Sequence, residues 1–443
     1  MSRQLFGTDG VRGRAGELLT AELVLAVART AVARCERTRP QVLVVRDTRE
    51  SGEMLEAAIA AGVTAAGGDA LLAGVLPTPA APLLVRRHSL DLAAVISASH
   101  NPYQDNGVKL FGADGFKLDD DDERAIEAEL GEDPRPSSQI GRVRRLHGSL
   151  EDYLRELHVR FERLDLDGMR ILLDCANGAT YRAAPEIFRR LGARVETLSD
   201  QPDGRNINDG CGSTHLELIA ERIVAGEFDV GFAFDGDGDR VLAVDRQGNA
   251  VDGDELIALA ALHMRECGRL TGGGVAVTVM TNYGFHAAMS EAGIEVASTS
   301  VGDRYVLEEL RRRGWSLGGE QSGHIIELGF GPSGDGIASA LLTIEALDGG
   351  DLAARTAIRK LPQRLINVRA GARESIQMAI ADDAVRAEIE RASSSLEGRG
   401  RVLVRASGTE PLIRVMVEAP TESETDTVSR SLAATIERVL AGD

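Results

Sequence analysis

The fold of this chain is indicated first by the stretch Val42-Leu43-Val44-Val45-Arg46, which is followed by the polar residues Asp47 to Gly52. A short run rich in valine is typical of a buried strand, and the polar residues after it predict a turn. An alanine-rich segment then predicts a helix, and Gly67-Gly68 leads into another apolar run. This order of strand, turn, helix, glycine and strand is typical of a parallel α/β unit with a right-handed crossover.

The same order occurs twice more along the chain. The second unit begins with a strand at Ile171–Asp174 and continues with a helix at Tyr181–Leu191. The third begins with a strand at Val275–Met280, turns at Asn282–Gly284, and has a helix that ends at Ala292. The repeat predicts three related α/β domains, although unrelated domains built from generic strand–helix–strand units would give the same pattern.

The C-terminal part of the chain has a different pattern. Strands are predicted at Leu365–Val368, Arg401–Arg405 and Leu412–Glu418, and helices at Arg373–Leu396 and Thr421–Leu440. Strands and helices in this order favour a small α+β domain with an antiparallel sheet. A chain of 443 residues is also too long for one core. We therefore predict α/β domains at 1–150, 151–253 and 254–362, and an α+β domain at 363–443.

The overall charge restricts the class of partner. The 50 basic and 69 acidic residues give a net charge of −19, with acidic residues along the whole chain. An acidic surface argues against nucleic acid or an anionic membrane as a partner. The N-terminal residues lack the apolar core of a signal peptide, and no apolar stretch reaches the length of a membrane span. The four cysteines form no C-x-x-C pair, so we expect a cytoplasmic protein with reduced thiols.

One candidate nucleophile lies on a short loop after a predicted strand. The apolar residues Leu92–Ile96 are followed by Ser97-Ala98-Ser99-His100-Asn101-Pro102. The Asn-Pro pair restricts the backbone, so the Ser99 hydroxyl is held on a rigid loop. No histidine–aspartate pair with sequence support would activate it, and Ser99 could be a plain turn serine. A serine that already carries a phosphoryl group needs no such activation.

A second loop carries three carboxylates at alternate positions. It reads Asp235-Gly236-Asp237-Gly238-Asp239-Arg240 and lies between the apolar runs Val230–Phe234 and Val241–Val244. Oxygen ligands at this spacing suit a hard divalent cation. An EF-hand is excluded, because its sixth position needs glycine and its twelfth glutamate, and these are Arg240 and Arg246 here. A solvated acidic turn is the remaining alternative.

Three further features add chemistry to these two loops. Lys109 is one of only three lysines in an arginine-rich chain, and a lysine can serve in proton transfer or neutralise phosphate, if it is not simply a surface residue. The loop Gly318–His324 could bind sugar hydroxyls and an amino group, with Glu320 complementing a positive charge. The segment Arg405–Pro411, with Arg414 behind it, could hold a phosphate. By contrast, the G-x-G-x-x-G match at Gly329–Gly334 contains a proline and is interpreted as a turn before a helix.

These motifs together resemble those of the α-D-phosphohexomutase family, and the resemblance covers essentially the whole chain in the expected order. The matching segments are Phe6–Gly13, Ser97–Pro102, Asp235–Arg240, Val301–Val306, Gly319–His324 and Arg405–Pro411. The resemblance implies four domains around a central cleft, with one loop from each domain. Within the family the chain is most similar to the bacterial members that act on glucosamine phosphates, and Gln321 supports this choice.

The resemblance also implies a role for each matching residue. Ser99 would be the phosphoserine, and Asp235, Asp237 and Asp239 would hold Mg²⁺ together with an oxygen of that phosphoserine. Arg12, Lys109 and Arg240 would surround the transferring group, and His324 would be a candidate proton carrier. Sugar-binding residues would be Asp303, Glu320 and Ser322. The phosphate group of the sugar that is not being transferred, called the distal phosphate, would be held by Arg405, Ser407, Gly408, Thr409 and Arg414.

The implied reaction converts glucosamine 6-phosphate to glucosamine 1-phosphate through a 1,6-bisphosphate, which supplies amino-sugar precursors of the cell wall. Glucosamine 1,6-bisphosphate or glucose 1,6-bisphosphate would be the activator, and a small-molecule sugar phosphate the partner. A kinase or autophosphorylation would first phosphorylate Ser99. A homodimer is compatible with the family. Two alternatives remain: a phosphomannomutase/phosphoglucomutase, and a sugar-phosphate phosphohydrolase that discharges the serine phosphate to water.

Overall fold

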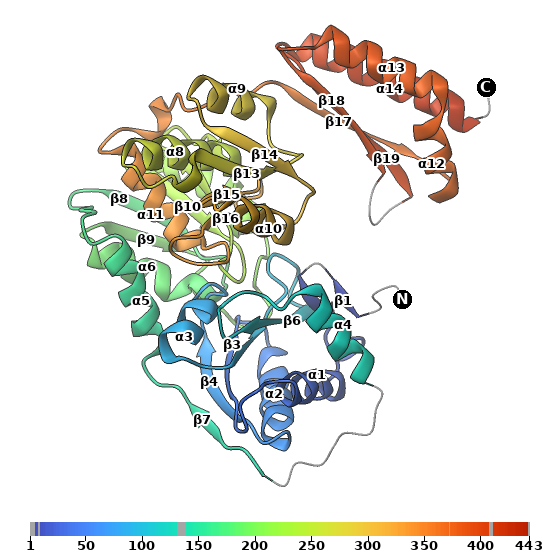
Figure 1. Cartoon of the computed structure of the whole chain (residues 1–443). Coiled ribbons are helices and arrows are strands. Elements are labelled where there is room, and N and C mark those ends of the chain that lie inside the picture. Colours follow the sequence, from blue (N-terminus) through green and yellow to red (C-terminus); the bar gives the residue numbers. More distant parts are fainter. Residues whose placement is uncertain (1–4, 8, 131–138, 372, 407–410, 442–443) are drawn as a thin grey trace. The chain divides into compact units, whose positions relative to one another are not determined.

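The computed structural model describes residues 5–7, 9–130, 139–371, 373–406 and 411–441. The chain forms two compact units, which are described separately below (Figure 1). The first unit comprises residues 1–280 and 294–355, and the second comprises residues 281–293 and 356–443. The first unit contains three sheets and the second contains one.

The first sheet has the strand order β1-β2-β6-β5-β3-β4-β7. Its strands are β1 (Phe6–Gly7), β2 (Gly10–Arg14), β3 (Gln41–Arg46), β4 (Asp69–Val75), β5 (Leu92–Ile96), β6 (Asp105–Gly112) and β7 (Val143–Arg145). Strand β3 is parallel to β4 and β5, as the strand–turn–helix pattern predicts. Strand β6 is antiparallel to both β5 and β2. The sheet is therefore mixed, because the short connection from β5 can only return the chain beside it in the opposite direction.

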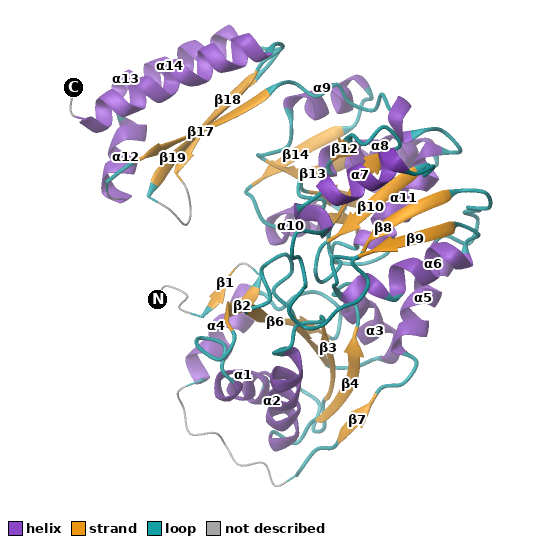
Figure 2. Cartoon of the chain, turned by 180° about the vertical axis from the view of Figure 1, so that it is seen from behind, coloured by secondary structure: helices purple, strands orange, loops and turns teal. Residues whose placement is uncertain are grey.

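Four helices belong to this sheet: α1 (Ala21–Ala33), α2 (Gly52–Ala65), α3 (Ala80–His88) and α4 (Asp120–Glu129). Helix α1 begins after Thr20, whose side chain accepts a hydrogen bond from the Leu23 amide. Helices α1 and α2 lie side by side (Figure 2). Gly62 allows this close packing, because a Cβ atom there would lie 2.3 Å from the Leu25 carbonyl oxygen. Val27 and Ile59 lie in the apolar core that the two helices share with the sheet.

The second and third sheets of this unit repeat the same plan. The second has the order β12-β11-β10-β8-β9 and the third has the order β14-β13-β15-β16. Their strands are β8 (Arg170–Asp174), β9 (Arg194–Leu198), β10 (Val230–Phe234), β11 (Val241–Asp245), β12 (Ala250–Val251), β13 (Gly274–Thr278), β14 (Glu295–Thr299), β15 (Leu317–Gly319) and β16 (Ile325–Glu327). The helices are α5 (Ser149–Arg160), α6 (Ala183–Arg190), α7 (Glu217–Ala225), α8 (Gly253–Glu266), α10 (Asp303–Arg313) and α11 (Gly336–Leu347). Asp335 caps the N-terminus of α11, so the turn predicted at 329–334 is confirmed.

All three sheets share one feature that places the functional loops. In each, a parallel strand is followed by a short loop and an antiparallel neighbour: β5 and β6, β10 and β11, and β15 and β16. The connecting loops are residues 97–104, 235–240 and 320–324. These are the serine loop, the aspartate loop and the Glu320 loop of the sequence motifs. The predicted repeat of three α/β domains therefore extends to the position of the loops.

The second unit is an antiparallel sheet with helices, as predicted for the C-terminal part. Its strand order is β17-β19-β18, and both pairs are antiparallel. Its elements are α9 (Tyr283–Glu291), β17 (Gln363–Arg369), α12 (Arg373–Ala381), α13 (Asp383–Ser395), β18 (Arg401–Ala406), β19 (Leu412–Glu418) and α14 (Glu422–Ala441). Helices α13 and α14 cover one face of the sheet (Figure 2). The single helix expected at 373–396 is two helices, because Asp382 caps the start of α13.

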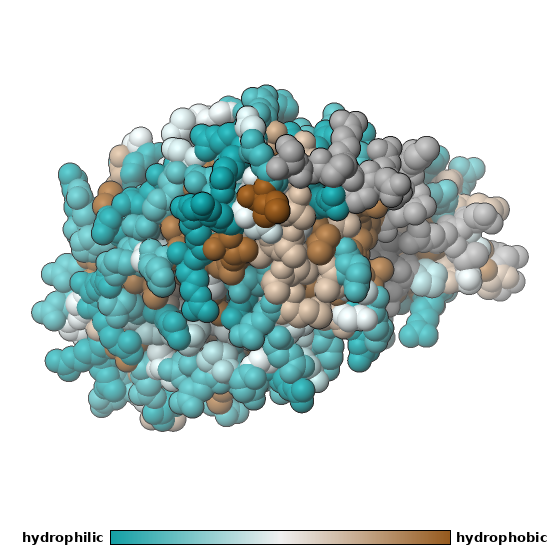
Figure 3. Space-filling model, turned by 90° about the horizontal axis from the view of Figure 1, so that it is seen from below, coloured by the Kyte–Doolittle hydropathy of each residue, from teal (hydrophilic) through white to brown (hydrophobic). Residues whose placement is uncertain are grey.

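The surface is mainly hydrophilic. Figure 3 shows one face, on which hydrophilic side chains surround a small hydrophobic group. Large hydrophobic side chains that are exposed in the first domain include Leu18, Met54, Ile140 and Val143. Among the described residues, no helix is both long and apolar enough to cross a membrane.

Candidate active site

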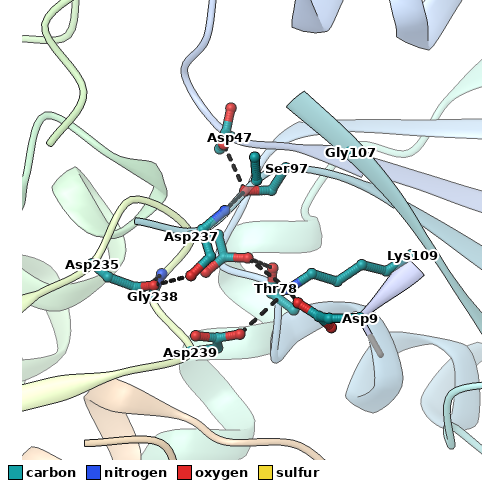
Figure 4. Close-up of polar contacts among 12 residues, drawn as sticks. Asp9, Asp47, Thr78, Ser97, Gly107, Lys109, Asp235, Asp237, Gly238 and Asp239 are labelled. Atoms are coloured by element: carbon teal, nitrogen blue, oxygen red, sulfur yellow. Dashed lines mark hydrogen bonds and ion pairs between the residues drawn. The ribbon is translucent and has the colours of Figure 1, made fainter. Parts of the chain in front are cut away.

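The serine loop between β5 and β6 holds Ser99 in a fixed position. Ser99 is fully buried, and its φ of 53° lies in the left-handed region, which is unfavourable for a serine. The Ser99 amide donates to the Ser97 hydroxyl at 2.9 Å, and that hydroxyl donates to Asp47 at 2.6 Å. Figure 4 shows the Ser97–Asp47 pair beside the aspartate loop. The backbone strain at Ser99 is therefore held by a buried network of hydrogen bonds.

The Ser99 hydroxyl points at the aspartate loop. Its Oγ donates to Asp235 Oδ2 at 2.5 Å and lies 3.2 Å from His100 Nδ1. Asp235 Oδ1 accepts from the amides of Gly238 and Arg240, which shapes the loop around this carboxylate. Gly238 has a φ of 74°, a turn conformation that glycine adopts without strain. The two loops singled out from the sequence are thus in direct contact.

Lys109 lies among the carboxylates of the aspartate loop. Its Nζ is 3.1 Å from Asp237 Oδ2, 3.3 Å from Asp239 Oδ2 and 3.0 Å from Asp9 Oδ2 (Figure 4). Burial would lower the pKa of Lys109, but these carboxylates raise the pKa well above its ordinary value. Lys109 is therefore a fixed cation. Of the two roles that the sequence allowed, neutralising charge fits this environment better than proton transfer.

The three aspartates form a group that suits a divalent metal ion. One carboxylate oxygen from each of Asp235, Asp237 and Asp239 lies within 4.8 Å of the other two. Asp237 Oδ1 and Asp239 Oδ1 are buried without a hydrogen-bond partner. Burial, followed by the charges of Asp239 and Asp237, raises the pKa of Asp235 well above its ordinary value. Buried carboxylate oxygens without partners and a hydroxyl beside them are the hard ligands of a magnesium- or calcium-type ion.

Arg12 and Lys117 add further positive charge around Asp9. Arg12 on β2 pairs with Asp9, and Lys117 bridges Asp9 and Asp303. Burial alone would raise the pKa of Asp9, but Lys109, Lys117 and Arg12 hold this pKa well below its ordinary value. On the serine side, Arg240 Nη1 lies 3.1 Å from His100 Nδ1. The site therefore combines several buried cations with several buried carboxylates.

A cavity of about 390 Å³ opens beside these groups, within the first unit. Its lining includes Asp9, Arg12, Asp239, Arg240, Asp303, Glu320 and His324. Glu320 Oε1 accepts from the Gly302 amide at 2.9 Å, which orients this carboxylate. Ser322 is exposed and is not part of this lining. Gln321 donates to Asp252 Oδ2 at 3.1 Å, and Asp252 caps helix α8, so this glutamine anchors the loop.

His324 is buried at the wall of this cavity. Its Nε2 accepts from the Gly334 amide at 3.0 Å, so the proton of the neutral ring is on Nδ1. Nδ1 lies 3.7 Å from Asp239 Oδ1. Burial would lower the pKa of His324, but Asp239 and Asp303 raise it above its ordinary value. This geometry favours a ring that donates through Nδ1–H.

The predicted phosphate-binding residues lie in the second unit. Arg405 on β18 is directly opposite Arg414 on β19. Burial, followed by the charge of Arg414, lowers the pKa of Arg405. Two like charges on paired strands repel each other, and an anion between them would relieve this repulsion. Ser407, Gly408 and Thr409 lie outside the described residues.

Several residues of the site were not predicted from the sequence. Thr78 donates to Asp237 Oδ2 at 2.7 Å, and Asp9 and Lys117 complete the group of charges. Asp9 lies inside the matching segment Phe6–Gly13. Lys117 is one of the three lysines, so the reasoning applied to Lys109 would have found it. Nothing in the local sequence marks Thr78, because its role depends on a loop more than a hundred residues away.

A buried serine hydroxyl, three carboxylates and surrounding cations on an α/β scaffold define the class of protein. These are the parts of an enzyme that transfers a phosphoryl group through its own side chain, where positioning and charge stabilisation provide most of the catalysis. The metal site, the cations and the cavity all lie where the loops of the three sheets meet.

Comparison with known proteins gives the family. The four domains described as phosphoglucomutase/phosphomannomutase domains I, II, III and C-terminal match residues 3–136, 151–248, 252–365 and 365–435. A phosphoglucosamine mutase from Moorella thermoacetica is 48% identical over 449 residues, covering 99% of each chain. A phosphoglucosamine mutase from Mycobacterium ulcerans is 49% identical and covers 97% of this chain and 98% of its own.

Solved structures show the same fold. A phosphoglucomutase/phosphomannomutase family protein from Burkholderia thailandensis has a TM-score of 0.83 at 22% identity, covering 98% of this chain and 97% of its own. The N-acetylphosphoglucosamine mutase of Aspergillus fumigatus, solved with GlcNAc-6P and magnesium, has a TM-score of 0.70 at 18% identity, covering 98% and 96%. The chain belongs to the phosphoglucomutase/phosphomannomutase family, which confirms the family resemblance of its motifs.

Proposed function

We propose that this protein is a phosphoglucosamine mutase that interconverts glucosamine 6-phosphate and glucosamine 1-phosphate. The observation that carries the proposal is the direct contact of Ser99 Oγ with Asp235, inside a cluster of carboxylates that suits a metal ion. The similarity to curated phosphoglucosamine mutases over nearly the whole chain supports this choice of sugar. The product would serve as an amino-sugar precursor of the cell wall.

In the proposed reaction Ser99 begins as a phosphoserine. Its phosphoryl group passes to a hydroxyl of the sugar monophosphate: the bond from phosphorus to Oγ breaks, and a bond to the sugar oxygen forms. The sugar hydroxyl loses its proton and Ser99 Oγ takes one up to become a free hydroxyl, so the protons balance and a sugar 1,6-bisphosphate results. The bisphosphate then turns in the cavity, and Ser99 Oγ takes back the other phosphoryl group. Arg12 and Arg240, which line the cavity, and Lys109, which lies among the aspartates, would stabilise the charge of the group in transfer.

The metal ion in this proposal is Mg²⁺. Asp235, Asp237 and Asp239 would hold it together with an oxygen on Ser99, and the unpartnered buried Oδ1 atoms of Asp237 and Asp239 fit this role. Bound there, Mg²⁺ would supply charge stabilisation to the phosphoryl group. A phosphoserine carries about −1.5 to −2 charges, so cations must lie near it.

Sugar and distal phosphate would be bound at two places. Glu320 and Asp303 line the cavity and are the proposed partners of the sugar hydroxyls and the amino group. His324 would donate a hydrogen bond through Nδ1–H. The arginine pair Arg405 and Arg414, with residues 407–409, would hold the phosphate that is not reacting. One reactive centre and one phosphate clamp can serve both ends of the sugar only if the bisphosphate turns over.

The other parts of the proposal concern the cellular setting. A sugar 1,6-bisphosphate would act as activator, and a kinase or autophosphorylation would first phosphorylate Ser99. All four cysteines are free, which suits a reducing compartment such as the cytoplasm. The domain boundaries at 150, 253 and 362, and a homodimer, also remain proposals.

A phosphorus NMR time course tests the proposed function. The protein receives Mg²⁺, a trace of glucose 1,6-bisphosphate and glucosamine 6-phosphate, with the variant Ser99→Ala as control. We expect a growing glucosamine 1-phosphate signal that is absent in the variant. Inorganic phosphate in place of this signal would support the phosphohydrolase alternative. Turnover of mannose or glucose phosphates but not of glucosamine 6-phosphate would support a phosphomannomutase/phosphoglucomutase.

A further inference from the structure

We propose that Arg49 is a positioning residue for phosphoryl transfer at Ser99, and that Asn208 assists it from the second α/β sheet. The proposal rests on the proposed function, because it concerns how the serine loop presents Ser99 Oγ to the metal site and the sugar. Neither residue belongs to the motifs that indicated the site.

The Arg49 guanidinium is hydrogen-bonded to the backbone of the serine loop. It follows β3 and is completely buried. Its Nη2 donates to the carbonyl oxygens of Ser99 and Asn101, at 2.8 and 2.9 Å. Its Nη1 donates to the carbonyl oxygens of Pro102 and Asp105. One guanidinium therefore binds three carbonyl groups of the loop that carries Ser99 and a fourth at the first residue of β6, an arrangement that suits the planar fork of an arginine.

Asp47 connects the same guanidinium to the other side of the loop. Arg49 Nε donates to Asp47 Oδ2 at 2.8 Å, and both side chains are fully buried. Asp47 Oδ2 also accepts from Ser97 Oγ, which in turn accepts from the Ser99 amide. The amide and the carbonyl group of Ser99 are thus both held through Arg49 and its partner. This network maintains the left-handed backbone at Ser99, on which the direction of the Oγ atom depends.

Asn208 adds a contact from another part of the first unit. Its Nδ2 donates to the carbonyl oxygens of Ser99 and Asn101, at 3.0 and 3.1 Å. These are the two carbonyl groups that Arg49 Nη2 also binds. Asn208 lies on the segment between β9 and α7, so it ties the serine loop to the domain that carries the aspartates. Its φ of 58° is a conformation that asparagine tolerates and glycine adopts freely.

The hydrogen bonds of Arg49 and Asn208 to the serine loop bear on the rate of phosphoryl transfer. Phosphoryl transfer needs the sugar oxygen, the phosphorus and Oγ close to a line, and a displacement of about 1 Å can reduce the rate about a hundredfold. Arg49 and Asn208 contact the serine loop only through its backbone carbonyl groups, and they do not line the sugar cavity. Their loss should therefore reduce kcat and leave KM for the sugar phosphate nearly unchanged.

The test compares three variants of the full-length protein. Arg49→Lys keeps the charge opposite Asp47 but loses the fork. Asn208→Gly removes the amide and keeps the backbone conformation, so it remains informative if Arg49→Lys does not fold. Arg205→Ala is the matched control, because Arg205 is exposed and pairs with Glu50, the neighbour of Arg49. Each protein is checked by near-UV circular dichroism, and its phosphoserine content is measured by intact-mass spectrometry.

Rates are then measured with glucosamine 6-phosphate, Mg²⁺ and glucose 1,6-bisphosphate, and kcat is expressed per mole of phosphoserine. We expect kcat to fall about a hundredfold in Arg49→Lys and about tenfold in Asn208→Gly, with KM within about twofold of wild type. Arg205→Ala should behave as wild type. A merely structural role would lower the amount of folded enzyme but not kcat per phosphoserine.

The outcomes separate the two proposals. Wild-type kcat per phosphoserine in both Arg49→Lys and Asn208→Gly, with an active wild-type enzyme, would overturn the positioning role and leave the proposed function standing. A rise in KM without a fall in kcat would also overturn it, because the residues would then act on sugar binding. A wild-type protein that does not convert glucosamine 6-phosphate would overturn the proposed function itself.

Discussion

The aspartate loop of the first unit and the arginine pair of the second are both groups of like charge, but the protein treats them differently. Asp235, Asp237 and Asp239 are buried, and Lys109 is buried with them. Arg405 and Arg414 are half-buried and face each other across two strands of one small sheet. The difference shows that a fully buried cluster of like charge needs counter-charges packed around it within the fold.

The comparison also separates stability from binding. Removing a charge from the buried group should affect both the stability of the protein and its activity. Removing a charge from the arginine pair should affect mainly ligand binding. Substitutions of Asp237, Lys109 and Arg414 test this distinction, and Asp237 should show the largest effect.

Asp237→Asn should cause the largest loss of activity. Asp237 accepts from Thr78 and Lys109 and offers a buried oxygen to a metal ion. Replacing this carboxylate with an amide removes one charge from the metal site, so we expect kcat to fall about a hundredfold or more. Initial rates across a Mg²⁺ titration measure both kcat and the metal requirement. An unchanged metal requirement would contradict the assignment of Asp237 as a ligand.

Lys109→Met should mainly change stability and its dependence on metal. The variant leaves the carboxylates Asp9, Asp237 and Asp239 without their shared buried cation, which should cost about 3–5 kcal/mol of unfolding free energy. Added Mg²⁺ should recover part of this loss, so the shift in Tm on adding Mg²⁺ should be larger than in wild type. Calorimetry with and without EDTA measures both shifts. Equal Tm shifts on adding Mg²⁺ in the two proteins would mean that Lys109 does not offset the negative charge of the aspartates.

Arg414→Ala should affect binding and leave stability nearly unchanged. Loss of one charged hydrogen-bond donor to the distal phosphate should raise KM for the sugar phosphate about tenfold or more. The unfolding free energy should change by less than about 1 kcal/mol, because the substitution also removes the repulsion with Arg405. Arg399→Ala, an exposed arginine that pairs with Glu424 in the same unit, is the control. A large drop in Tm would show that the pair is structural.

The smallest effect concerns pH and a histidine of the second unit. Burial and the charge of Arg401 lower the pKa of His286 from 6.5 to about 4. The unfolded chain therefore binds this proton more tightly than the folded chain does. The stability from neutral His286 is complete above pH 6.5 and is lost as the pH falls towards 4.

His286→Gln should remove this dependence. Between pH 7 and pH 5.5 the wild type should lose about 1 kcal/mol more stability than His286→Gln does. Calorimetric unfolding of both proteins at the two pH values measures the difference. Parallel losses in the two proteins would show that His286 has the same pKa in the folded and unfolded chains.

The sequence predicted the site residues that lie within one loop motif, but not those whose partners are distant in the chain. Motifs confined to one loop, such as Asp235 to Arg240, can be recognised because spacing alone places their carboxylates together. Thr78 and Asn208 each act on a partner that is distant in the chain, so no local pattern marks them. Arg49 lies in the polar turn that indicated the fold, yet its donors go to a loop fifty residues further on.

The predicted sheets show the same limit. The strand–turn–helix pattern indicated the parallel strands β3, β8 and β13, and these are present. The antiparallel partners β6, β11 and β16 were not foreseen as a common feature. A short apolar strand carries no signal for the direction of its neighbour, since that direction depends on the length and path of the connection.

The sequence by itself determined the family, the succession of α/β units and the residue types of the reactive loops, because local pattern and spacing encode them. Only the tertiary structure decided that the serine and aspartate loops touch, that Lys109 lies among three carboxylates, and that Arg49 binds the backbone of the serine loop. Such contacts join residues far apart in the chain. They form only when packing of the sheets brings buried polar groups together and each must find a partner.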